Sequence, residues 1–224
     1  ENVAVGHNAL GSNTTGTKNT AVGDGAMAAN TVGGDNTALG DAALIDNTTS
    51  IRNTALGRAA LASVTANSNR HVAIGYAALL SLSGGNEDVA IGNEAGVSMT
   101  SASNNVLIGS YCGDAITTGG HNVAIGRHTL GSTTTASSLT AVGDNALFAN
   151  TTGYSHTAVG AGALDTTTTS YQCNAFGKDA LRSCTTGVNN NAFGTNALSA
   201  VTTGNHNVAM GQGAGQSITT GNGN

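Results

Sequence analysis

Proline and tryptophan are absent from this chain of 224 residues, and aromatic residues account for only 3% of it. Charged residues are also scarce, at 8% against roughly 25% in an average domain. The apolar residues, 39% of the sequence, are mainly small aliphatic ones, so the thick core of an ordinary globular enzyme is not expected. The net charge of -5 comes without a cluster of either sign, which excludes the electrostatic signature of a nucleic-acid-binding protein.

Long apolar stretches and metal-binding cysteine patterns are missing as well. No apolar run approaches the length that crosses a membrane, and the first residues show no basic segment followed by an apolar one. We therefore expect neither membrane insertion nor a signal peptide. The three cysteines form no CxxC pair, which argues against a metal framework built on them.

What the chain does contain is one motif, Asn-Thr/Val-Ala-large apolar-Gly, repeated thirteen times. Eleven of the twelve intervals between the closing glycines are 17 residues, and the interval from Gly57 to Gly75 is 18. This period is too short for a pair of helices and, with its β-branched residues, fits one coil of a β-solenoid that holds two short strands. We predict an all-β, parallel β-solenoid of thirteen stacked 17-residue coils. The closing glycines are Gly6, Gly23, Gly40, Gly57, Gly75, Gly92, Gly109, Gly126, Gly143, Gly160, Gly177, Gly194 and Gly211.

Small side chains recur at fixed phases of this repeat. The residue two before the glycine is Ala in twelve copies and Leu107 in the other. Such uniform smallness predicts close packing, either against another chain or against the opposite wall of a thin roll. The positions that we assign to this packing or assembly face include Ala21, Ala38, Ala55, Ala141 and Ala158.

A second correlation concerns the Leu that usually stands four residues after the glycine. Gly replaces it in three copies, and in those copies the residue seven after the motif glycine is Met or Ile. We expect the two positions to fill one core pocket, so that the lost Leu side chain is offset by the other one. The three pairs are Gly96 with Met99, Gly113 with Ile116, and Gly215 with Ile218.

The repeat is in the same phase at both ends of the sequence, since Asn2 and Asn224 occupy equivalent positions. Solenoids need caps or neighbours to cover their terminal coils. We therefore expect residues 1–224 to form a single uncapped repeat array that belongs to a longer fibre or joins end to end with other subunits.

The segments Asn19-Thr20-Ala21-Val22-Gly23, Asn36-Thr37-Ala38-Leu39-Gly40 and Asn122-Val123-Ala124-Ile125-Gly126 resemble the head repeats of YadA-type trimeric autotransporter adhesins. They are also similar to related repeats in phage tail fibres and bacterial surface fibre proteins. The resemblance extends over the whole chain. It implies a left-handed parallel β-roll, commonly trimeric, in an extracellular or virion fibre that adheres to surfaces.

Chemical sites are not expected. The six histidines fall in unrelated phases of the repeat, which favours solvent-exposed turn residues over a metal site built on adjacent coils. Acidic residues that follow the motif glycine are interpreted as solvated turns rather than Ca²⁺ ligands. Neither a nucleophile with a base partner in repeat phase nor a phosphate-binding loop is found. We therefore predict no catalytic residue, no cofactor and no metal, and a protein that is not an enzyme.

Two kinds of modification site remain open. The sequons at Asn13, Asn47 and Asn150 all fall seven after a motif glycine, which would put them on one loop edge. They are either N-glycosylation acceptors or turn-favouring Asn residues that happen to precede Thr. Threonine runs at 133–135 and 166–169 could carry O-glycans on the same edge.

The cysteines suggest a disulfide. Cys173 lies four before Gly177 and Cys184 seven after it, and both replace residues that are usually polar in other copies. Their joint appearance in one coil favours a Cys173-Cys184 disulfide, which fits an oxidising extracellular setting, over two thiols on the surface. Cys112 replaces a small Ala and is expected to be a buried thiol outside that bond.

The leading hypothesis is a non-enzymatic structural or adhesive fibre segment on a cell surface, outside the cell or on a virion. Its partners would be copies of itself, in a trimer or an end-to-end filament, and a cell-surface or glycan receptor. The alternative is a ligand-binding solenoid such as an ice-binding protein, which would use the Thr ladder near Thr14-Thr15, Thr48-Thr49 and Thr151-Thr152.

Overall fold

The computed structural model describes all 224 residues as strands and turns without a helix. The chain divides into two compact units, residues 1–118 and residues 119–224. Each coil contributes one three-residue strand. The first unit contains β1 (Val3–Val5), β2 (Thr20–Val22), β3 (Thr37–Leu39), β4 (Thr54–Leu56), β5 (Val72–Ile74), β6 (Val89–Ile91) and β7 (Val106–Ile108). The second contains β8 (Val123–Ile125), β9 (Thr140–Val142), β10 (Thr157–Val159), β11 (Asn174–Phe176), β12 (Asn191–Phe193) and β13 (Val208–Met210).

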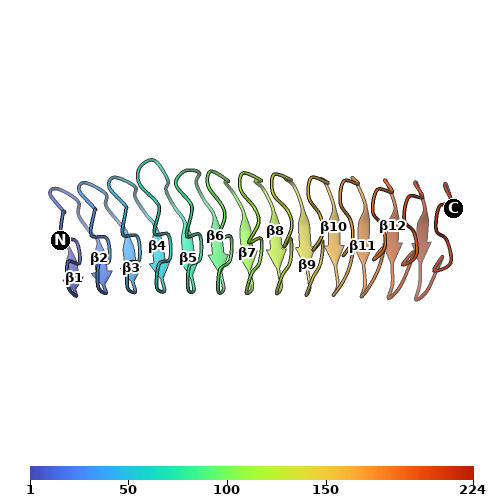
Figure 1. Ribbon diagram of the computed structural model, residues 1–224, viewed down its shortest axis with the longest axis horizontal. Helices are drawn as coiled ribbons and strands as arrows, with labels where there is room; N and C mark the ends of the chain where they lie inside the picture. Colours follow the sequence, from blue (N-terminus) through green and yellow to red (C-terminus); the bar gives the residue numbers. More distant parts are fainter. The chain divides into compact units, whose positions relative to one another are not determined.

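Within each unit, consecutive strands pair in parallel and equivalent residues of the repeat lie side by side (Figure 1). Ala21 of β2 pairs with Ala38 of β3, for example, and Phe176 of β11 with Phe193 of β12. This in-register pairing of residues 17 apart confirms the predicted all-β parallel solenoid. The inserted residue between β4 and β5 leaves the register intact, because Ala55 still pairs with Ala73.

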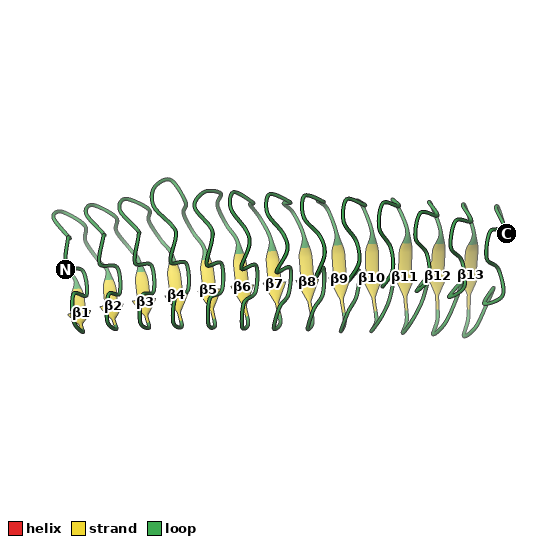
Figure 2. Cartoon of the chain, viewed as in Figure 1, coloured by secondary structure: helices red, strands yellow, loops and turns green.

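The prediction of two strands in each coil was wrong. The segment that follows the motif glycine is a series of turns (Figure 2), because its second and fourth residues adopt left-handed backbone conformations. In the third coil these are Ala42, with φ 56°, and Leu44, with φ 50°. The backbone still bonds to the next coil, since the Leu44 N–H donates to the Ala60 carbonyl oxygen at 3.0 Å. Backbone hydrogen bonds therefore join neighbouring coils on both the strand side and the turn side, although only the strand side is extended.

The motif glycine cannot be replaced without strain. Gly40 has a φ of 142°, where L-residues are rarely found, and a Cβ at this position would lie 2.5 Å from the carbonyl oxygen of Gly57. The same close approach to the next coil recurs from Gly6 to Gly92 in the first unit and from Gly126 to Gly194 in the second. The spacing between coils therefore explains why the motif ends in glycine at these positions.

Aliphatic residues fill the interior of each coil. Strand residues alternate, so that the central Ala points inward, and it meets the Ala and Leu located three and four residues after the glycine. Ala38, Ala43 and Leu44 of the third coil are fully buried. Where Gly replaces the Leu, the predicted compensation is confirmed, because the Met99 sulfur and the Ile116 Cδ1 lie 2.8 and 2.9 Å from the positions that a Cβ would take at Gly96 and Gly113.

Candidate functional site

The outward face of the strands carries the most regular apolar surface of the protein. The first and third residues of each strand point away from the interior, and the third is always large and apolar. Phe176 and Phe193 are stacked with their ring centroids 5.0 Å apart, and both remain more than one-third exposed. We call this surface the outer strand face. Its exposed apolar members are Val3, Val5, Leu39 and Leu56 in the first unit, and Val123, Ile125, Phe176, Phe193, Val208 and Met210 in the second.

The alanines assigned to a packing or assembly face lie inside the coils. Ala21, Ala38, Ala55, Ala141 and Ala158 are all fully buried within the single chain. The sequence left open whether these alanines pack against another chain or against the opposite wall of a thin roll. The structure shows the second arrangement. These alanines are therefore not available for a contact with another chain.

Two rows of threonine follow the loop edge of the second unit. Every coil from residue 134 onward carries a Thr-Thr pair, eight and nine residues after its glycine. The first Thr of four of these pairs donates its hydroxyl to the next coil: the Thr151 hydroxyl, for example, donates to the Thr168 carbonyl oxygen at 3.0 Å, and Thr168, Thr185 and Thr202 do the same. The second row is exposed to solvent and consists of Thr135, Thr152, Thr169, Thr186, Thr203 and Thr220.

Charged residues directly after the motif glycine form pairs between neighbouring coils. Arg58 Nε lies 3.1 Å from Asp41 Oδ2, and Arg127 Nε lies 3.1 Å from Asp144 Oδ1. These side chains are more than 40% exposed, and exposed pairs contribute little to stability. No group of three or more His, Cys, Asp or Glu residues is arranged to hold a metal ion.

Inside the coils, a ladder of asparagines runs along the position four before the glycine. Asn19 Oδ1 accepts the backbone N–H of Asn36 at 3.0 Å, and Asn19 Nδ2 donates to the carbonyl oxygen of Gly33 at 2.8 Å. The pattern recurs in the second unit, where Asn190 bonds in the same way to Asn207 N and Gly204 O. Each amide thus satisfies a backbone donor of the next coil and a carbonyl of its own loop, which is why a polar residue is buried here.

His71 and His156 occupy this ladder, so the prediction that all six histidines are solvent-exposed was wrong. Both are buried, and Nδ1 of His71 accepts the backbone N–H of Asp88 at 3.2 Å. An imidazole nitrogen can take over the acceptor role of the Asn oxygen, which explains the substitution. The recurrence of Asn four residues before the motif glycine was the sequence signal that could have predicted burial of these two histidines.

Around His71, three residues have the order of a Ser-His-Asp triad. Ser68 Oγ lies 3.0 Å from His71 Nε2, and His71 Nδ1 lies 3.4 Å from Asp88 Oδ2. The second contact is an ion-pair distance rather than a hydrogen bond, since Nδ1 already accepts the backbone N–H of Asp88 and Oδ2 has no donor. All three residues are fully buried, so no substrate can reach the hydroxyl and we interpret the trio as part of the ladder.

The sequons lie inside the coil rather than on an exposed loop edge. Asn47 and Asn150 are fully buried, and their Nδ2 atoms donate to the carbonyl oxygens of Ser50 and Gly153. Asn13 is partly exposed, and its Nδ2 donates to Gly16 O at 3.1 Å. Because an N-glycan is attached through Nδ2, this geometry favours the structural interpretation of these asparagines over glycosylation of the folded chain.

All three cysteines are buried thiols in the structure. Burial raises the pKa of Cys112 to about 12. Cys173 and Cys184 both point at the carbonyl oxygen of Gly187, at 3.3 and 3.4 Å. The alternative of two surface thiols is therefore excluded, whereas the Cys173-Cys184 disulfide stays a prediction.

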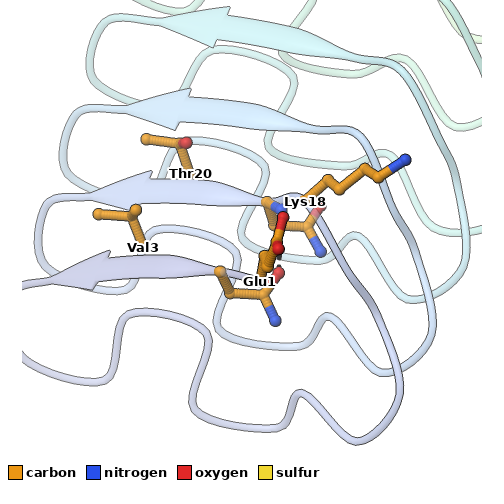
Figure 3. A pocket seen from close by; sticks show the side chains of 6 residues that line it. Glu1, Val3, Lys18 and Thr20 are labelled. Atoms are coloured by element: carbon orange, nitrogen blue, oxygen red, sulfur yellow. Dashed lines mark hydrogen bonds between the residues drawn. The ribbon is translucent and has the colours of Figure 1, made fainter.

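Two open grooves are present at the surface. One, of about 430 Å³, is lined by residues of the first two coils, including Glu1, Val3, Lys18 and Thr20, with Val3 and Thr20 on adjacent strands (Figure 3). The other, of about 310 Å³, lies beside Asp179 and Arg182 in the second unit.

The chain matches no protein-family model, no curated protein and no solved structure. No helix of the structure has the length and hydropathy of a membrane span.

Proposed function

We propose that the chain is a non-enzymatic structural segment of a fibre, extracellular or virion-borne, which associates with copies of itself through the outer strand face. The observation that carries this proposal is the exposed apolar row on that face. Leu39 is 47% exposed and Phe176 38%, although both lie in strands that are paired on both sides. Rows of apolar residues on a soluble surface are typical of interaction sites.

The geometry of the face favours a second copy of the chain as its partner. Equivalent side chains repeat at every strand, so they stand at the strand spacing of about 4.8 Å. Two such faces have the same spacing and can interdigitate over their whole length, as packed β-sheets do at a distance of about 10 Å. The outer strand face carries no lysine or arginine to oppose such contact.

The interior supports a role in length and stiffness rather than catalysis. Within each unit, neighbouring coils bond to one another through their strands, their turns and the asparagine ladder. Contacts of this kind involve only neighbouring coils, so the number of coils sets the length of the segment. An adhesive function would use the remaining exposed surface, where a cell-surface or glycan receptor could contact the polar loop edge.

Electron microscopy of the purified 224-residue chain tests this proposal. We expect regular particles that contain several chains, either bundled side by side or joined into filaments. Single, separate chains at every protein concentration would contradict it.

The threonine rows of the second unit favour one alternative, an ice-binding solenoid. Six exposed threonines at equal spacing form a regular hydroxyl surface, and the first row holds the coils in register through its own hydrogen bonds. Thermal hysteresis measured on the wild-type chain and on a Thr152→Lys/Thr169→Lys variant decides between the two functions. Hysteresis that the variant loses would support ice binding, and its absence in the wild type would exclude it.

A further inference from the structure

The two positions occupied by Cys173 and Cys184 share one hydrogen-bond acceptor in other coils of the protein too. In the second coil the equivalent residues are Asn19 and Asn30, and both amides donate to the carbonyl oxygen of Gly33, at 2.8 and 3.2 Å. The two thiols repeat this arrangement, since both donate to Gly187 O, at 3.3 and 3.4 Å. The fold of the coil, and not a local distortion, therefore brings the sulfurs together.

Both sulfurs are enclosed. Cys173 and Cys184 are fully buried, and the Cys173 backbone N–H donates to Nδ1 of the buried His156 at 3.2 Å. Each thiol also affects the ionisation of the other. The neighbouring Cys184 side chain lowers the pKa of Cys173 to about 5, and the neighbouring Cys173 side chain raises the pKa of Cys184.

We propose that Cys173 and Cys184 are joined by a disulfide that forms during folding, by exchange with a small-molecule disulfide, and is then sealed inside the coil. The bond would connect the residue before strand β11 to the end of the turn segment that follows Gly177. It would replace the pair of amide hydrogen bonds that holds the same two sides together at Asn19 and Asn30.

The chemistry is an exchange of thiols and disulfides. The Cys173 thiolate attacks one sulfur of a disulfide such as oxidised glutathione and releases one glutathione thiolate. The Cys184 thiolate then attacks the Cys173 sulfur of the mixed disulfide and releases the second glutathione. The protein loses two protons and two electrons, and the small-molecule disulfide is reduced to two thiols. Because both sulfurs are buried in the folded coil, exchange must precede closure of the coil, and reductants are excluded afterwards.

Trypsin provides a direct readout, because Lys178 and Arg182 lie between the two cysteines. Cleavage separates Cys173, in peptide 128–178, from Cys184, in peptide 183–224, while Cys112 lies in peptide 71–127. We expect the chain folded with oxidised and reduced glutathione, then denatured and alkylated, to yield peptides 128–178 and 183–224 as one linked species that separates on reduction. Alkylation of all three cysteines in this sample would overturn the proposal.

A matched control restores the asparagine pair. The Cys173→Asn/Cys184→Asn variant should fold, since it recreates the Asn19 and Asn30 arrangement, and should give no linked peptides. The oxidised wild-type chain should melt roughly 5–10 °C above its reduced form, because the bond closes a short loop, whereas the variant should show no such difference. Equal melting temperatures for the oxidised and reduced wild type would show that the bond is not a stabilising element of the folded coil.

Discussion

Leu107 fills the space that a side chain at Gly113 would occupy. A Cβ at this glycine would lie 3.0 and 3.1 Å from the two terminal methyl carbons of Leu107. The same side chain reaches Gly96 in the preceding coil, where the corresponding distance is 3.0 Å. The single copy in which the strand alanine is replaced by a larger residue thus lies in a coil that has lost its core leucine, and the preceding coil has lost its core leucine as well.

Removing Leu107 should therefore leave a cavity that its neighbours cannot close. We expect Leu107→Ala to cost about 2–5 kcal/mol of unfolding free energy, the usual range for Leu→Ala in a core. Gly113→Ala should be less damaging in the Leu107→Ala background than in the wild type, because the clash with the Leu107 methyls is gone. Denaturant titration of the four proteins measures this coupling, and strictly additive losses would contradict the shared pocket.

The motif glycines offer a matched pair of substitutions. Gly40→Ala places a Cβ against the carbonyl oxygen of Gly57, whereas a Cβ at Gly211 meets nothing within 4 Å in this chain. Both have positive φ, 142° and 119°, so both variants bear about 1–3 kcal/mol of backbone strain. Only Gly40→Ala adds the steric clash, for roughly 1–3 kcal/mol more. Equal melting temperatures for the two variants would refute the close approach of successive coils.

The buried His71-Asp88 pair should be replaceable only as a pair. His71→Asn alone removes the imidazole that lies 3.4 Å from Asp88 Oδ2 and leaves this buried carboxylate oxygen with neither a donor nor a neighbouring imidazole, and we expect a loss of about 1–3 kcal/mol of unfolding free energy. The double variant His71→Asn/Asp88→Asn restores the asparagine ladder and should unfold close to the wild-type denaturant midpoint. A double variant as unstable as the single one would show that these residues do more than replace asparagines.

Cys112 should be inert in the folded protein. Burial raises the pKa of its thiol from 9.0 to about 12, so near neutral pH the thiolate fraction falls roughly a thousandfold. Because the thiolate is the reactive form, alkylation of Cys112 at pH 8 should be slow in the native chain and fast in denaturant. Mass spectrometry of peptide 71–127 follows the reaction. Fast native alkylation would place Cys112 near the surface.

The repeat made much of the fold predictable. Its period, the motif glycines and the alternation around the strand alanines indicated stacked parallel coils, and the exchange of Leu for Gly located the pocket filled by Met99 and Ile116. These signals are periodic, so thirteen copies reinforce one another. The second strand was mispredicted because nothing in the composition marks Leu44 as a residue with positive φ. Tertiary stacking imposes that conformation against the local preference of the residue.

The environment of the polar residues was harder to predict. Asn is mostly exposed in proteins and His is intermediate, and both Asn47 and His71 were expected at the surface. In the structure both satisfy backbone groups inside the coil, a role that depends on the neighbouring turn. The apolar outer strand face, in contrast, follows directly from the alternation, because a buried central alanine requires its two neighbours to point outward.

Sedimentation velocity of the wild-type chain and of a Phe176→Thr/Phe193→Thr variant tests the proposed self-association most directly. Thr is already present at strand positions of this protein and suits an extended backbone, so the variant should fold while losing the stacked rings of the outer strand face. Thr152→Ser/Thr169→Ser on the loop edge serves as the control. The account predicts that the wild type and the control sediment as oligomers and that the Phe variant shifts toward the monomer. A wild-type monomer at all concentrations, or an oligomer that the Phe variant leaves unchanged, would contradict it.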